Sequence, residues 1–171
     1  MVGHEVFNNG HTIQVNYLPG SSIDIDGQSF ELKQFHFHAP SENHINGSSS
    51  PLEVHYVHAN DKGQLAVVAV MFKEGNENKP LKGAWLGMPK IAGDKVSYHS
   101  NFNAKYLLPD NKDYYRFNGS LTTPPCSEGV RWLVMKDSLE ASKQQIEKFT
   151  QLIGHDNNRP IQPLNARVLL E

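Results

Sequence analysis

The feature that most constrains the fold of this chain is a series of short runs in which apolar and polar residues alternate. The runs are residues 14–17, 29–39, 53–59, 64–73 and 131–135. A period of two predicts strands, because successive side chains of a strand point to opposite faces of a sheet. Asp26-Gly27, between residues 23–25 and 30–32, is a signal for a tight hairpin turn. We therefore expect strands to dominate the fold.

Helical patterns are fewer. Asp137 is placed to cap a helix, with Glu140 three residues later, and Gly154 is placed to end it. The apolar stripe of this predicted helix consists of Leu139, Ile146, Phe149, Leu152 and Ile153. A shorter helix is predicted around residues 81–86. Several strands and few helices in 171 residues predict a single, mainly β domain spanning residues 1–171.

Composition and charge exclude several classes of function. The net charge of −2 gives no basic excess for nucleic acid or for an anionic membrane surface. The longest apolar run, residues 65–72, is too short to span a bilayer. We expect no signal peptide after Met1, because polar residues interrupt any apolar segment there. The single cysteine, Cys126, cannot form an intrachain disulfide, which leaves a buried small hydrophobe, a reactive thiol or half of an external bridge.

Three histidines lie in the alternating runs. On a strand, His36 and His38 share one face, while Phe35 and Phe37 point to the opposite face. His55, in the following run, is placed to join them from a neighbouring strand. Three imidazoles with one open position are the arrangement of a catalytic zinc site. This spacing predicts a metal centre.

Two further residues lie on the same strand faces as these histidines and could support such a centre. Gln34 lies on the face of His36, and Glu53 lies on the face of His55. A histidine that binds a metal normally donates its second N–H to a carboxylate or carbonyl oxygen, and these side chains are placed to accept. The alternative interpretation is a set of exposed histidines on an amphipathic strand, which the flanking phenylalanines and the two acceptors disfavour.

A second kind of metal site also fits part of the pattern. His36-x-His38-x-x-x-Glu42 matches the core motif of cupin barrels, in which Glu42 would be a ligand and the metal would be iron or manganese. The glycine that a cupin needs before the first histidine is replaced by Phe30, and no second cupin motif is evident. The cupin interpretation is the weaker one.

Taken together, several motifs in chain order resemble the α-carbonic anhydrase family. They are Asn8-Asn9-Gly10-His11, Gln34-Phe35-His36-Phe37-His38, Ser41-Glu42, Glu53-Val54-His55, the segment from Gly119 to Pro125, and the segment from Asn157 to Asn165. The residues after the double proline, from Cys126 to Val130, resemble bacterial members. The resemblance implies a large, mainly antiparallel, twisted central sheet with a few peripheral helices, and zinc in a cone-shaped cleft.

The resemblance also implies an activity, the reversible zinc-dependent hydration of carbon dioxide to bicarbonate and a proton. Zn²⁺ would be held by His36, His38 and His55. Thr122 would accept a hydrogen bond from the zinc-bound hydroxide and be oriented by Glu42, and His11 would carry protons. The remaining implied site residues line the substrate pocket: Thr123 on its polar side, and Val57, Val67, Leu121, Val130 and Trp132 on its apolar side.

Two departures from the family pattern bear on function. The family has a substantial stretch before the Asn-Asn-Gly-His motif, where this chain has only residues 1–7, so we expect an N-terminally truncated domain. In bacterial members that stretch carries the cysteine that pairs with the equivalent of Cys126. Phe117 stands where the family often has tyrosine. A catalytically impaired zinc-binding relative is therefore the alternative to an active enzyme.

The remaining implied properties concern partners and location. The expected partner is the small-molecule substrate, carbon dioxide or bicarbonate, with neither nucleic acid nor membrane. A homodimer is compatible with the resemblance. Resemblance to bacterial members implies a periplasmic or secreted protein.

Overall fold

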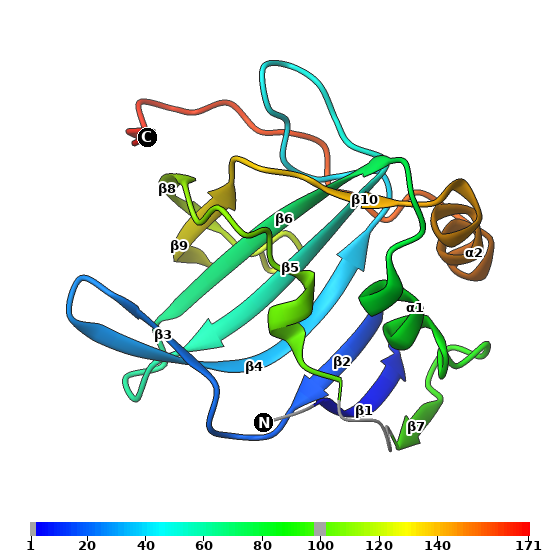
Figure 1. Cartoon of the computed structure of the whole chain (residues 1–171). Coiled ribbons are helices and arrows are strands. Elements are labelled where there is room, and N and C mark those ends of the chain that lie inside the picture. The colour runs from blue at the N-terminus through cyan, green and yellow to red at the C-terminus, as the bar shows by residue number, and fades with distance from the viewer. Residues whose placement is uncertain (1–2, 98–101) are drawn as a thin grey trace.

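A mixed sheet forms the body of the computed structural model, which describes residues 3–97 and 102–171 (Figure 1). Within those residues the strands follow the order β7-β1-β2-β4-β5-β6-β9-β8, with β3 paired to β4 and β10 paired to β6. The strands are β1 Gly3–Asn8, β2 Ile13–Tyr17, β3 Ser22–Ile25, β4 Gln28–His38, β5 Leu52–Ala59, β6 Leu65–Glu74, β7 Lys95–Ser97, β8 Tyr114–Ser120, β9 Glu128–Met135 and β10 Leu139–Ala141. The helices are α1 Lys79–Trp85, η1 Ala104–Leu107 and α2 Lys143–Ile153.

The described strands pair mainly antiparallel, as predicted. The exceptions are the parallel pairs β6 with β9 and β10 with β6. All five predicted alternating runs form strands, with ends that differ by at most three residues. The predicted hairpin joins β3 to β4, with Ile25 opposite Gln28. Asp26 (φ 51°) and Gly27 (φ 72°) both adopt the left-handed conformation that such a two-residue turn requires.

Alternation along β4 separates the two faces of the sheet. Phe35 and Phe37 are fully buried in the main core, on the face that carries the helices. The Phe37 ring packs edge-on against Trp85 of α1, with centroids 4.5 Å apart, and also contacts Phe149 of α2. Helices α1 and α2 lie together beside the sheet in Figure 1. His36, which lies between these phenylalanines, and His38, which follows them, therefore face the other side.

The predicted start of the long helix is wrong. Asp137 does not cap it, because residues 139–141 form β10 and pair in parallel with residues 72–74 of β6. The helix begins after Ser142, whose hydroxyl accepts from the Gln145 N–H, while the Gln145 side chain accepts from the Ser142 N–H. This complete capping box fixes the start of α2. Gly154 (φ 77°) ends the helix as predicted.

The shorter predicted helix is confirmed as α1. It begins earlier than predicted because the Asn78 side chain accepts a hydrogen bond from the Leu81 N–H at 2.9 Å, which caps the first turn. Strands β1, β7 and β8 and helix η1 were not predicted. None of the described helices is long and apolar enough to cross a membrane.

Candidate metal centre

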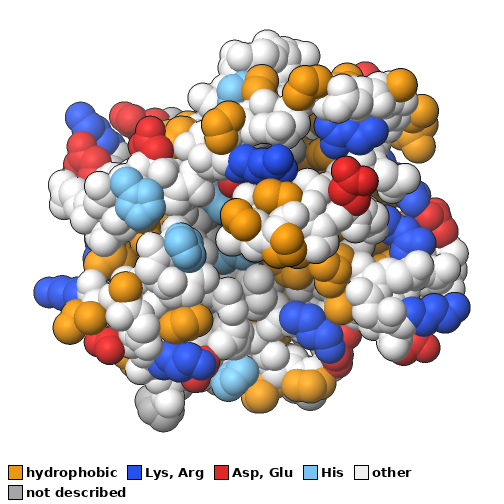
Figure 2. All heavy atoms as spheres, turned by 180° about the vertical axis from the view of Figure 1, so that it is seen from behind, with side chains coloured by type: hydrophobic (Ala, Val, Ile, Leu, Met, Phe, Trp, Pro, Cys, Tyr) orange, Lys and Arg blue, Asp and Glu red, His pale blue; other side chains and the backbone are white. Residues whose placement is uncertain are grey.

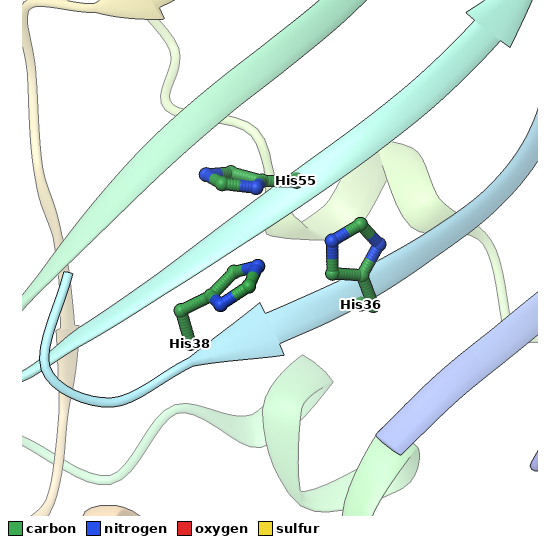
Figure 3. A group of neighbouring side chains, drawn as sticks. All are labelled: His36, His38 and His55. Carbon is green, nitrogen blue, oxygen red and sulfur yellow. The ribbon is translucent and has the colours of Figure 1, made fainter. Parts of the chain in front are cut away.

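Two neighbouring strands carry the three histidines. In the antiparallel pair β4 and β5, His36 lies directly opposite His55, and His38 lies opposite Glu53. Because His36 and His38 are two residues apart, both rings project from the same face as His55. Figure 3 shows the three imidazoles turned toward one another. One ring nitrogen from each lies within 4.8 Å of the others, which is a spacing that one metal ion can bridge.

Each imidazole also contacts an oxygen through a ring nitrogen. The Gln34 side-chain oxygen lies 2.8 Å from Nδ1 of His36. The backbone carbonyl of Asn157 lies 2.9 Å from Nδ1 of His38, and Oε1 of Glu53 lies 3.1 Å from Nε2 of His55. These contacts leave Nε2 of His36, Nε2 of His38 and Nδ1 of His55 for a shared ligand. Oxygens in such positions fix the ring orientation and tautomer of metal-binding histidines.

The donor set fits zinc. Nε2 of His38 is buried and has no hydrogen-bond partner among residues 3–97 and 102–171, as expected of an atom whose partner is a metal. Three neutral imidazoles with an open fourth position are the donor set of catalytic zinc sites.

Burial and neighbouring charges set the protonation of the ligands. Burial, together with His38 and His55, holds the pKa of His36 well below its ordinary value. Burial and then His55 lower the pKa of His38 to about 3. Both rings are thus neutral near neutral pH, which is the form that binds a metal. Burial would lower the pKa of His55, but Glu53 beside it raises that pKa. Burial would raise the pKa of Glu53, but His55 and Asn43 lower it.

Glu42 lies next to the three histidines but is not one of the clustered ligands. Its Oε1 accepts a hydrogen bond from the Arg159 N–H at 2.7 Å, and its Oε2 lies 3.8 Å from Nδ1 of His55. Burial raises the pKa of this carboxyl, while His55 and a hydrogen bond with the Thr122 side chain oppose the rise. Glu42 and Thr122 are therefore neighbours, and the group of side chains that could hold a metal ion consists of three histidines without the Glu42 of the cupin motif.

A cavity of about 500 Å³ opens onto the centre. The structure brings several predicted site residues to its wall: His11, Gln34, His36, His38, Glu42, Thr122 and Thr123. Figure 2 shows histidine side chains gathered around a hollow on one face of the molecule. His11 is exposed on this wall, and its backbone carbonyl accepts from Nδ2 of Asn157 at 2.9 Å.

The predicted apolar residues form a cluster beside the centre instead of lining this cavity. Its members include Val57, Val67, Leu121, Val130 and Trp132. The Trp132 ring stands edge-on to His55, with centroids 4.9 Å apart. Trp132 and Thr122 also line an adjoining hollow of about 350 Å³. Phe117, at the position where tyrosine was expected, stacks on Trp132 with ring planes 4° apart.

Two contributors were missed by the sequence-based predictions. Asn157 supplies the acceptor for His38 through its backbone carbonyl, and Arg159 holds Glu42 through its backbone N–H. Their positions carried no signal, because any residue has these backbone groups. Their segment did belong to a motif of the resemblance, which was the available clue. Cys126 is half-buried and unpaired in the described chain.

Comparison with known proteins identifies the family. The family model for eukaryotic-type carbonic anhydrases matches residues 2–171. The chain belongs to the carbonic anhydrase family. The carbonic anhydrase of Pectobacterium carotovorum is 50% identical over 166 residues, covering 97% of this chain and 68% of that protein. The carbonic anhydrase of Neisseria gonorrhoeae is 52% identical over 168 residues, covering 98% of this chain and 66% of that protein. The chain thus spans about two thirds of these carbonic anhydrases.

Solved carbonic anhydrase structures share the fold. The α-carbonic anhydrase from Thermovibrio ammonificans, in complex with the inhibitor sulfanilamide, superposes with a TM-score of 0.98 at 49% identity. That match covers all of this chain and 76% of the other. A hyperthermostable carbonic anhydrase from a hydrothermal vent chimney superposes with a TM-score of 0.96 at 57% identity, covering 98% of this chain and 75% of the other. The large, mainly antiparallel sheet predicted for this family is confirmed, and zinc is the metal that this family uses.

Proposed function

We propose that this chain catalyses the reversible hydration of carbon dioxide to bicarbonate and a proton, with zinc held by His36, His38 and His55. The observation that carries the proposal is the convergence of three imidazoles, each with an oxygen against a ring nitrogen and another nitrogen left for the metal. Bound zinc supplies a Lewis acid that lowers the pKa of a coordinated water to about 7. Uncharged imidazoles preserve the positive charge on which that effect depends.

Thr122 and Glu42 are proposed to orient the nucleophile. Glu42 already accepts from the Arg159 N–H, and its carboxyl interacts with Thr122. If the Thr122 hydroxyl donates its proton to Glu42, it can only accept a hydrogen bond from the nucleophilic oxygen. That arrangement fixes a lone pair of the oxygen toward carbon dioxide before reaction.

The other site residues are proposed to hold the substrate and to remove the proton. The apolar cluster beside His55 is proposed to offer carbon dioxide a non-polar surface through its half-buried members Val57 and Leu121. Val67, Val130 and Trp132 are at most 4% exposed and form the rest of that cluster. Thr123 and His11 lie on the polar wall of the cavity. Histidine is the side chain best suited to relay protons near neutral pH, so His11 is proposed to pass the product proton to solvent.

We further propose that residues 1–171 act as one domain, either as a monomer or as a homodimer. Its bacterial relatives support a bacterial origin, and by analogy we propose a periplasmic or secreted location.

The alternative function is a zinc-binding relative with impaired catalysis. The stacked Phe117, where a hydroxyl was expected near Thr122, is the observation that favours it.

The test combines zinc analysis with carbon dioxide hydration kinetics on the purified, zinc-loaded chain. We expect about one zinc per chain and measurable hydration. His55→Ala should abolish both, whereas His4→Ala, which changes an exposed histidine on β1, should alter neither. Zinc stoichiometry unchanged in His55→Ala would refute the ligand assignment. A chain that keeps its zinc but does not hydrate carbon dioxide would support the alternative.

Variants of Thr122 and His11 should fail in different ways. Thr122→Val should lower the second-order rate constant for carbon dioxide by on the order of a hundredfold, because a preorganised hydrogen bond is lost. His11→Ala should lower only the maximal rate, and concentrated imidazole buffer should restore it. Equal loss of both kinetic constants without rescue would contradict the role of His11.

A further inference from the structure

His155 is an exposed histidine that lines the same cavity as His11, His36 and His38. It follows directly after Gly154, whose left-handed conformation (φ 77°) ends α2 and turns the chain. No role for it was predicted from the sequence, and the proposed mechanism does not use it. Figure 2 shows histidine side chains at the surface beside the hollow, as well as others within it.

Hydrogen bonds connect the segment that contains His155 to both His38 and His11. Two residues further on, the Asn157 carbonyl accepts from the His38 ring at 2.9 Å. The Asn157 side chain donates to the carbonyl of His11 at 2.9 Å and accepts from the Ala39 N–H at 2.8 Å. The segments that carry His11 and His155 are therefore neighbours on one rim of the cavity.

We propose that His155 is a second proton carrier of this cavity and works in parallel with His11. The proposal rests on the carbonic anhydrase function proposed above. Hydration of carbon dioxide by one water yields bicarbonate and one proton. A neutral imidazole accepts that proton on a ring nitrogen, and the resulting imidazolium releases a proton to buffer, which returns the imidazole to its neutral form. Two exposed imidazoles on one rim provide two such routes.

The test measures hydration by the zinc-loaded chain at low and high buffer concentration. The variants are His11→Ala, His155→Ala and the double variant, with His155→Gln as a polar replacement that cannot carry a proton and His4→Ala as an exposed control outside the cavity wall. At low buffer the double variant should lose several-fold more of the maximal rate than His11→Ala alone. The second-order rate constant should stay the same, and imidazole should restore the maximal rate.

The outcomes distinguish a failure of the His155 proposal from a failure of the proposed carbon dioxide hydration. An active wild type whose double variant matches His11→Ala would overturn the role of His155 and leave the function standing. A zinc-loaded wild type without hydration activity would overturn both. A second readout does not depend on activity: in the cobalt-substituted chain, the ring proton signals of His155 should be broadened by the paramagnetic ion more than those of His4. Equal broadening would contradict the position on which the proposal depends.

Discussion

At the scale of single residues, Glu53 organises the surroundings of His55. Its Oε2 accepts from the backbone N–H groups of Glu42 at 2.6 Å and Asn43 at 3.1 Å. Its Oε1 accepts from Nδ2 of Asn43 at 2.7 Å and lies 3.1 Å from Nε2 of His55. The side chain is fully buried, so these contacts replace all of its hydration. One carboxylate therefore positions both a ligand ring and the backbone of Glu42.

We predict that Glu53→Gln weakens zinc binding by about 10- to 100-fold, which is the usual cost of losing an oxygen behind a metal-binding histidine. The amide nitrogen introduced by the substitution faces N–H donors whichever way the side chain turns. Competition with a chelator measures the affinity, and circular dichroism checks the fold. The control is Glu74→Gln, at an exposed position of β6. An unchanged zinc affinity would show that Glu53 has a purely structural role.

Tyr56 couples stability to alkaline pH on the core face of the sheet. Its hydroxyl donates to the Leu107 carbonyl at 2.9 Å, and burial together with the nearby Tyr17 raises its pKa well above the ordinary value of 10.0. The folded chain thus retains a proton that the unfolded chain releases above about pH 10. This contribution to stability is complete below that pH and is lost as pH rises toward the folded-state pKa.

We predict that the free energy of unfolding falls less steeply above about pH 10 in Tyr56→Phe than in the wild type. At neutral pH the variant should be less stable by about 1 kcal/mol, because the Leu107 carbonyl loses its donor. Urea unfolding across this pH range measures both effects. Tyr106→Phe, at a position 64% exposed, serves as control and should behave like the wild type. Parallel pH profiles for the wild type and Tyr56→Phe would contradict the prediction.

At the scale of elements, the caps of α1 and α2 are connected through one side chain. Gln145 closes the capping box of α2 with Ser142. Its amide also accepts from the Asn78 N–H and donates to the Asn78 carbonyl, both at 2.8 Å. Asn78 in turn caps α1. The two helices that cover the phenylalanines behind the metal centre therefore start from a shared set of hydrogen bonds.

We predict that Ser142→Ala lowers the free energy of unfolding by about 1 kcal/mol, which is typical of a lost N-cap. Gln145→Ala should cost more, because it removes the second half of the capping box and both hydrogen bonds to the backbone of Asn78, each worth about 0.5–1.5 kcal/mol. Lys143→Ala, at the exposed first position of α2, should change stability by less than about 0.5 kcal/mol. Urea denaturation gives all three values. Equal effects of Ser142→Ala and Lys143→Ala would mean that the capping box contributes nothing.

The elements also show how far the sequence leads. Strand β4 was predictable because one of its faces packs on the buried core and the other does not, which imposes the period of two on its residues. The start of α2 was misplaced because Leu139 fits a helical stripe, although its backbone pairs with β6. That pairing joins residues far apart in the chain, and a local pattern does not contain it. Strand β8 was not predicted, because the burial of its residues does not alternate.

The candidate site likewise has a part that could be predicted from local sequence and a part that could not. His36, His38 and His55, with Gln34 and Glu53, followed from parity on two strands, because side-chain direction on a strand is set locally. The acceptor for His38 is a backbone carbonyl 119 residues away. Its role depends on the tertiary path of the chain and not on the identity of its own side chain, so no property of residue 157 could have revealed it. The position of His155 on the cavity wall likewise depends on the tertiary path of the chain.

At the scale of the whole molecule, the sheet separates an aromatic core from the metal centre. Zinc should stabilise the fold, because its three ligands meet only when β4 and β5 are paired. We predict that zinc at 100 times its dissociation constant adds about 2.7 kcal/mol to the free energy of unfolding. Thermal unfolding with zinc and with a chelator tests this. His55→Ala should show no zinc-dependent shift, and an equal shift in that variant would place the stabilising metal elsewhere.

The bond between His38 and the Asn157 carbonyl bears on how the protein is made. During translation, the three histidines are added to the chain long before residues 157–159. Those later residues supply the acceptor for His38 and the backbone donor for Glu42. Until residue 157 has been added, the ring of His38 lacks the carbonyl that accepts its hydrogen bond in the folded chain. We therefore expect metal capture in its final geometry to be a late event of biosynthesis, and we expect a chain released before residue 157 to bind zinc weakly.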